Sequence, residues 1–147
     1  MDNHQTIFWK GAHTYHRLLY HIVFVPKYRR RVLQGKVVQR ISQLLYQCAE
    51  VNQWFIDELV VEPDHVHLLI QLSATISIPK AVMLMKGGTS KVLRHEFPKL
   101  TEFLWGKSFW QDGYFVETVG RQHELAIRRY LQKPNQEKRE DQTSPVL

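Results

Sequence analysis

The feature that most restricts how this chain can fold is the stretch at 62–70, which reads Glu-Pro-Asp-His-Val-His-Leu-Leu-Ile. Its Pro-Asp pair is a turn signal, and the runs on either side, at 54–61 and 65–72, are rich in β-forming side chains. Two such runs joined by so short a connection pair as an antiparallel hairpin. The sequence therefore predicts two adjacent strands that flank this turn.

The second of these strands carries two histidines, His65 and His67, separated by one residue. Residues i and i+2 of a strand share a face, so the two imidazoles should project side by side while Val66, Leu68 and Ile70 face the other way. Two converging imidazoles form half of a site for a divalent metal. The alternative interpretation is two polar residues on a solvated strand face, where histidine is common.

The order of the remaining elements predicts the fold class. Further apolar runs and turn residues predict strands at 18–25 and 113–119, and helices at 37–51, 77–97 and 124–133. The order β-α-β-β-α-β followed by a helix is that of the ferredoxin-like, or RRM-like, α+β fold, which has a four-stranded antiparallel sheet with helices on one face. We expect His65 and His67 on the face that these helices leave uncovered.

The length of 147 residues corresponds to one domain, with an irregular lead-in over about 1–17 and a polar tail over about 135–147. The single cysteine, Cys48, excludes an internal disulfide and fits a reducing compartment. The N-terminus lacks the apolar core of a signal peptide, and no apolar run reaches the roughly 18 residues of a membrane span. These properties predict a soluble cytoplasmic protein.

A formal net charge of +6 favours a polyanionic partner, most often nucleic acid. The cations cluster in three segments that could meet at one sheet face: Lys27, Arg29, Arg30 and Arg31, then Lys86, Lys91 and Arg94, then Arg121, Arg128, Arg129 and Lys133. The residues predicted to contact nucleic acid are Lys27, Arg29, Arg30, Lys86, Lys91, Arg128 and Arg129. For any single cluster, the simpler interpretation is a solvated surface.

Four segments of the chain carry a family resemblance: Tyr-His-Ile-Val-Phe-Val-Pro-Lys-Tyr-Arg-Arg at 20–30, Pro-Asp-His-Val-His-Leu-Leu at 63–69, the region 109–120, and Ile-Arg-Arg-Tyr-Leu at 127–131. In this order and spacing, they resemble the single-tyrosine HUH transposases (TnpA-like) of small bacterial insertion sequences that move as single-stranded DNA. They look like that family's first strand and basic turn, its histidine–hydrophobe–histidine metal motif, its fourth strand, and the helix that carries its nucleophile.

The resemblance implies an enzyme that cuts single-stranded DNA at the ends of a mobile element, recognises hairpins near those ends and rejoins the strands. It implies that Tyr130 becomes linked to a 5′ phosphate while His65 and His67 bind Mg²⁺ or Mn²⁺. It also implies a homodimer in a bacterial or archaeal cytoplasm, in which the histidines of one subunit act with the tyrosine of the other. Imidazole ligands make Mn²⁺ the tighter binder of the two ions.

The last helix departs from the family pattern at one position. The family usually has a glutamine four residues after the tyrosine, as a third metal ligand, and here that position is Pro134. Proline has no side-chain donor or acceptor, and it ends the helix. The next glutamine, Gln136, looks like the family's ligand displaced by two residues.

Other interpretations of Tyr130 and of the fold stay open at this point. Tyr130 shares a helical stripe with Ile127 and Leu131, and a tyrosine in that position is usually a packing residue. A non-catalytic binder of single-stranded nucleic acid with an RRM-like fold would stack bases on sheet aromatics such as Phe24. A metal-dependent nuclease would attack with water and leave Tyr130 structural. Only the transposase would leave protein covalently attached to DNA.

Overall fold

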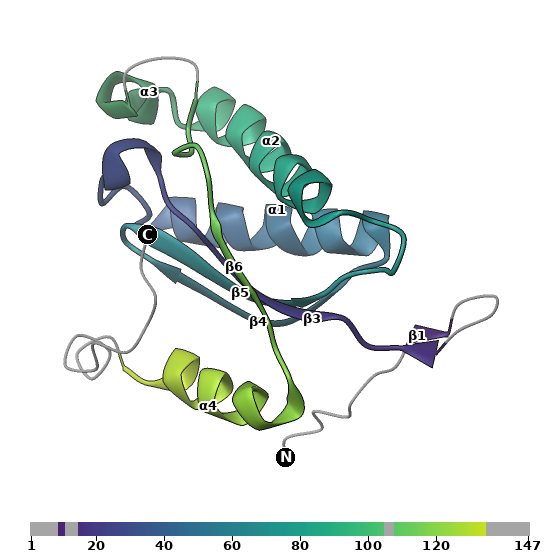
Figure 1. Cartoon of the computed structure of the whole chain (residues 1–147). Helices are drawn as coiled ribbons and strands as arrows, with labels where there is room; N and C mark the ends of the chain where they lie inside the picture. The colour runs from purple at the N-terminus through teal and green to yellow at the C-terminus, as the bar shows by residue number, and fades with distance from the viewer. Residues whose placement is uncertain (1–8, 11–14, 105–107, 135–147) are drawn as a thin grey trace.

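The computed structural model describes residues 9–10, 15–104 and 108–134. Its main sheet consists of β3 (Leu19–Phe24), β4 (Phe55–Glu62), β5 (His65–Gln71) and β6 (Phe115–Thr118), in the spatial order β4-β5-β3-β6 with every neighbouring pair antiparallel. Helix α1 (Lys36–Asn52) connects β3 to β4, and α2 (Ile78–Glu96) lies between β5 and β6 in the chain (Figure 1). The predicted ferredoxin-like α+β fold is confirmed.

The hairpin between β4 and β5 has the geometry that the sequence predicts. Glu62 pairs with His65, so Pro63 and Asp64 alone form the turn. Beyond the turn, the side chains of β5 alternate between two environments. Val66, Leu68 and Ile70 are completely buried in the larger core, which α1 and α2 cover (Figure 1). The histidines therefore face the other side of the sheet, as expected.

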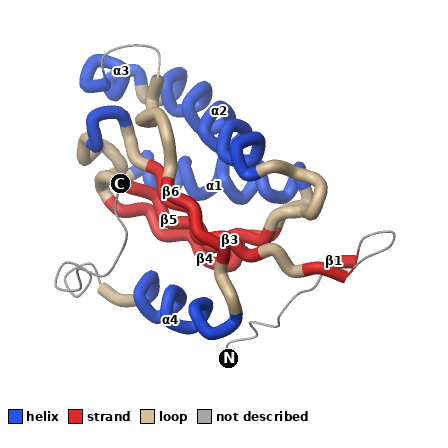
Figure 2. The backbone as a smooth tube through the Cα atoms, in the orientation of Figure 1, coloured by secondary structure: helices blue, strands red, loops and turns tan. Residues whose placement is uncertain are grey.

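That other side is covered by α4 (Arg121–Gln132), which Figure 2 shows across the sheet from α1 and α2. A second, smaller apolar cluster forms there from Leu131 of the helix together with Leu19, Leu69 and Val119. The last helix of the chain thus occupies part of the sheet face that α1 and α2 leave uncovered.

Four smaller elements were not predicted from the sequence. They are the pair β1 (Trp9–Lys10) and β2 (Tyr15–His16) within the expected irregular lead-in, the 3₁₀ turn η1 (Lys27–Arg29), and α3 (Pro98–Leu104). Within the described ranges, no helix is both long and apolar enough to cross a membrane.

Phe24 does not lie where the RRM-like interpretation needs it. Its side chain is completely buried in the larger core, with its ring edge-on to Trp110 at 4.8 Å between centroids. The parity of β3 directs Phe24 towards α1 and α2, because Ile22 and Phe24 share one face of the strand. The expectation that Phe24 stacks bases on an open sheet face is therefore wrong.

Candidate active site

Three of the predicted site residues meet on the α4 side of the sheet. The rings of His65 and His67 are 4.6 Å apart between centroids, and their planes are close to perpendicular. The ring of Tyr130, near the end of α4, lies 6.4 Å from the ring of His67. His67 is only 1% exposed, whereas Tyr130 is half-buried. One chain therefore brings the two histidines and the tyrosine together.

His65 is held by the turn that precedes it. Its Nδ1 atom lies 2.6 Å from Oδ1 of Asp64, whose Oδ2 accepts a hydrogen bond of 3.1 Å from Nε of Arg29. Partial burial acts to raise the pKa of Asp64, but the bond with His65 and the charge of Arg29 outweigh it and hold this pKa below its ordinary value. Arg29 reaches the carboxylate from a left-handed backbone conformation, at φ 51°. The basic turn after β3 is thus tied to one of the two histidines.

His67 has a different partner, His21 of β3, which the sequence analysis did not single out. Nε2 of His21 lies 3.1 Å from Nδ1 of His67, and Nδ1 of His21 lies 3.1 Å from a carboxylate oxygen of Glu117 on β6. The only signal in the sequence is a histidine at an alternate position of an otherwise apolar strand, which does not reveal its partners.

The two histidines fit a divalent metal in their local chemistry. Because Nδ1 of each ring is bonded to another side chain of the protein, Nε2 is the atom that each would offer to an ion. Metal-binding histidines commonly have their second ring nitrogen fixed in this way. Among the described residues, no group of three or more His, Cys, Asp or Glu could hold a metal ion. The predicted third ligand, Gln136, lies outside the described residues.

Arg128 lies buried between α4 and β4. Its guanidinium nitrogens are 2.7 Å from a carboxylate oxygen of Asp57 and 2.7 Å from one of Glu124, and 3.5 Å from that of Glu58. Burial acts to lower the pKa of Arg128, but the carboxylates outweigh it and raise this pKa above its ordinary value. This position differs from the exposed one that we expected for a residue contacting nucleic acid.

A β-bulge in β4 brings two of these carboxylates to the same place. Ile56 pairs with Ile70 and Glu58 pairs with Leu69, so Asp57 is an extra residue that is skipped in the ladder register between β4 and β5. Asp57 and Glu58 would face opposite sides of a regular strand, yet both reach the guanidinium of Arg128. The bulge therefore lets consecutive acidic residues bind one side chain of α4.

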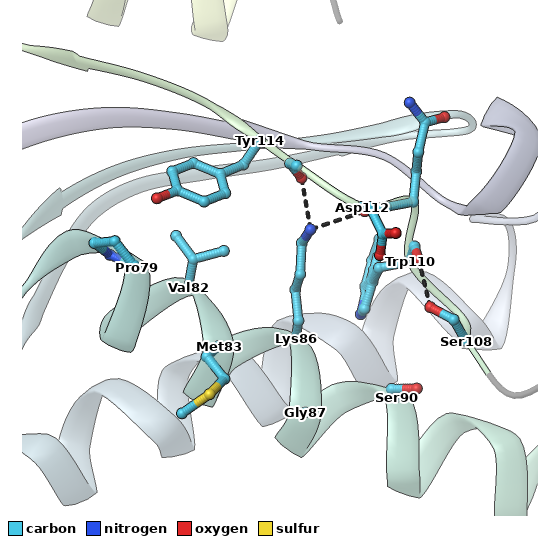
Figure 3. A pocket seen from close by; sticks show the side chains of 12 residues that line it. Pro79, Val82, Met83, Lys86, Gly87, Ser90, Ser108, Trp110, Asp112 and Tyr114 are labelled. Carbon is cyan, nitrogen blue, oxygen red and sulfur yellow. Dashed lines mark hydrogen bonds between the residues drawn. The ribbon is translucent and has the colours of Figure 1, made fainter.

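The predicted cationic clusters do not share one face, because α2 and α4 cover opposite sides of the sheet (Figure 2). Lys86 of α2 donates hydrogen bonds of 2.8 and 2.6 Å to the backbone carbonyls of Gln111 and Gly113, beside a pocket of about 410 Å³ (Figure 3). Burial lowers the pKa of Lys86. Lys86 thus holds the segment that leads into β6, while Lys91 and Arg129 are exposed.

The first cationic cluster forms a surface depression after β3. Its volume is about 730 Å³, and its lining includes Tyr28, Arg29, Arg30, Arg31, Val32 and Gln34. Arg30 and Arg31 are exposed, and the amine of Lys27 lies 5.4 Å from the centre of the Tyr28 ring. Guanidinium groups beside an aromatic ring can bind both the phosphates and the bases of a nucleic acid.

Comparison with known proteins gives consistent results. The family described as "Transposase IS200 like" matches residues 14–134. The ISDra2 transposase TnpA of Deinococcus radiodurans is 32% identical over 123 residues, which are 84% of this chain and 88% of that protein. The transposase for insertion sequence element IS200 of Salmonella typhimurium is 34% identical over 110 residues, covering 75% of this chain and 72% of its own length.

Solved structures agree with the fold. The crystal structure of a Deinococcus radiodurans protein proposed to be a transposase has a TM-score of 0.72 and 32% identity, with coverage of 83% of this chain and 94% of that one. A REP-associated tyrosine transposase bound to a REP hairpin has a TM-score of 0.55 and 15% identity, with coverage of 89% and 70%. The second likeness shows the fold alone.

Replacing Arg128 with methionine tests how α4 is held. The change leaves the buried carboxylate of Asp57 without its cation, whereas Glu124 keeps Arg17, and a buried ion pair broken in this way costs about 3 kcal/mol or more. We expect the amides of α4 to exchange with deuterium faster, while those of β5 keep their protection. Arg129→Met, at an exposed neighbouring position, is the matched control and should match the wild type. Equal protection of α4 in both variants would contradict the role given to Arg128.

Proposed function

The chain belongs to the IS200-like transposase family, and from this premise we propose that it cleaves and rejoins single-stranded DNA at the ends of an insertion sequence. The family is one of enzymes that cut DNA and transfer its strands. The observation that carries the more specific proposal is the convergence of His65, His67 and Tyr130 from β5 and α4. A nucleophile beside two side chains that could bind a metal is an arrangement suited to phosphodiester cleavage through a covalent intermediate.

Tyr130 is the nucleophile in this proposal. Its Oη atom attacks the phosphorus of the scissile phosphodiester, and the bond from phosphorus to the 3′ oxygen breaks. The downstream DNA stays linked to Tyr130 through its 5′ phosphate, and the proton that the tyrosine loses balances the one that the departing 3′ hydroxyl gains. Rejoining is the same step in reverse with another 3′ hydroxyl, so the phosphotyrosine keeps the bond energy and no ATP is needed.

His65 and His67 would hold Mg²⁺ or Mn²⁺ through their Nε2 atoms. When bound, the ion neutralises the negative charge of the non-bridging phosphate oxygens, which otherwise repels a nucleophile. Support comes from the partners that fix both Nδ1 atoms. Imidazole ligands should make Mn²⁺ bind more tightly than Mg²⁺. Gln136 remains the candidate for a third ligand from the chain.

The DNA partner that we propose is a single strand with hairpins near the element ends. The REP-associated tyrosine transposase, which has a similar fold, is bound to a REP hairpin, and a net charge of +6 suits a polyanion. The exposed side chains of Arg30, Lys91 and Arg129 are the clearest candidates for phosphate contacts. Lys27 and Arg29 lie next to Arg30 in the turn after β3.

Alanine at either histidine should separate binding from cleavage. His65→Ala and His67→Ala are each expected to abolish cleavage of a hairpin oligonucleotide in the presence of Mn²⁺. Binding of the same oligonucleotide in a mobility-shift assay should stay close to that of the wild type, because affinity for the DNA backbone comes from the cations. His95→Ala, at an exposed position of α2, is the control and should affect neither assay. Parallel loss of binding and cleavage would mean that the two histidines are structural.

Phenylalanine at position 130 removes one oxygen and little packing. With single-stranded substrate labelled on the segment 3′ of the cut, the wild type should give a slowly migrating covalent adduct on a denaturing gel. Tyr130→Phe should stay folded, bind DNA and form no adduct, whereas Tyr46→Phe, at an exposed tyrosine of α1, should form it normally. An adduct with Tyr130→Phe would assign the chemistry to another tyrosine. Cleavage by the wild type without any adduct would favour the hydrolytic nuclease.

We further propose a homodimer in which an edge strand pairs with that of a second copy. In the described sheet, β4 and β6 are the edge strands, and an open edge otherwise favours aggregation. If Tyr130 of the partner subunit acts with the histidines of this chain, α4 must first leave its own sheet, with Gly120 as the hinge. Light scattering at micromolar concentration should report a dimer. A monomer that still cleaves DNA would contradict a site shared between subunits.

A further inference from the structure

Three side chains form a continuous polar chain across β6, β3 and β5. Glu117 lies directly opposite His21 in the ladder between β6 and β3, and its carboxylate is 3.1 Å from Nδ1 of His21. The other nitrogen of His21 is 3.1 Å from Nδ1 of His67, and the planes of the two rings are nearly parallel, with an interplanar angle of 10°. His21 is 3% exposed, and Phe115 packs edge-on against it.

The carboxylate determines which way the protons point along this chain of groups. An ionised carboxylate can only accept hydrogen bonds, so Nδ1 of His21 must carry the proton and donate it to Glu117. In a neutral imidazole, the other nitrogen of His21 then has the lone pair, and it accepts from Nδ1–H of His67. His67 is left with its lone pair on Nε2, the form of the ring that can bind a metal at that atom.

The opposite direction of these hydrogen bonds would prevent His67 from binding a metal through Nε2. If Nε2 of His21 carried the proton, it would donate to Nδ1 of His67, and the proton of His67 would sit on Nε2 instead. In that arrangement, Nδ1 of His21 would face the carboxylate of Glu117 without a proton. Because His21 is buried, little water could reach it to supply the missing hydrogen bond. The carboxylate of Glu117 therefore determines, through His21, which nitrogen of His67 carries the proton.

We propose that Glu117 and His21 are positioning residues that fix His67 in the tautomer with its lone pair on Nε2. This inference rests on the proposed role of His67 as a metal ligand, and it assigns a function to two residues outside the predicted site. It differs from the way in which His65 is held, since Asp64 contacts that ring directly without an intervening imidazole.

The wild-type protein without metal provides the first test. In protein labelled with ¹⁵N at histidine, the ring nitrogen shifts distinguish a protonated nitrogen from one with a lone pair. We expect His67 to be protonated at Nδ1, and His21 likewise. Protonation of His67 at Nε2 in the wild type would overturn the inference without the need for any variant.

The second test is Glu117→Gln, whose amide can both donate and accept, so that both hydrogen-bond directions become possible. We expect part of His67 to shift to the Nε2-protonated form, and the dissociation constant for Mn²⁺, measured by calorimetry without DNA, to rise roughly tenfold or more. Glu96→Gln makes the same chemical change at the end of α2, where Glu96 pairs with Arg40 of α1, and it should change neither measurement.

The two measurements separate failure of this inference from failure of the proposed function. If Glu117→Gln keeps the wild-type tautomer of His67 and the wild-type affinity for Mn²⁺, the role of Glu117 and His21 is wrong while the metal site stands. If the wild type itself binds no Mn²⁺, the metal site is wrong, and the role of its positioning residues falls with it.

Discussion

Burial of β5 on both faces is the constraint on which the rest of the structure depends. Leucine, isoleucine and valine side chains fill one face, but the other places two imidazoles beneath α4. A buried polar ring is costly unless its nitrogens have partners. Asp64 and His21 each supply a partner for Nδ1 of one ring, and these hydrogen bonds both offset part of the cost of burial and fix the orientation of the two rings. A strand with neighbours on both sides is also a more rigid base for such a site than a loop would be.

The position of α4 rests on a different balance. Apolar contacts around Leu131 attract the helix to the sheet without fixing its orientation. The ion pairs of Arg128 with its carboxylate partners depend on geometry, so they fix how α4 is oriented on the sheet. Buried ion pairs add little net free energy because desolvation offsets much of their attraction. Asp57 illustrates this, since burial raises its pKa even though Arg128 and Gln71 both act to lower it. The network therefore fixes the orientation of the helix more than it strengthens the binding of the helix to the sheet.

Much of the fold could be predicted from the sequence because its signals are local. Strand alternation gave the shared face of His65 and His67, and the Pro-Asp pair gave the hairpin. The assignment of Tyr130 needed the family resemblance, because its helical stripe alone is that of a packing residue. The structure places its ring beside His67, which agrees with the assignment without testing the chemistry.

The partners of the site residues could not be predicted, because they are tertiary. Arg128 belongs to a run of basic residues that suggests solvent exposure, and only the fold brings acidic residues of a distant strand against it. His21 and Glu117 are 96 residues apart in the chain, and only the pairing of β3 with β6 places them opposite each other. Burial and strand order, rather than residue type, decide both cases.

Because of the bulge at Asp57, the number of residues in β4 determines which acidic side chains can pair with Arg128 of α4, 71 residues further along the chain. On either side of the bulge, odd and even positions exchange faces, so the ladder consists of two segments of opposite parity. Deleting one residue between the start of β4 and the bulge would give an unbroken ladder with only one of Asp57 and Glu58 on the α4 side. Insertions and deletions in this half of β4 are therefore constrained by electrostatics as well as by packing, unlike those in a surface loop.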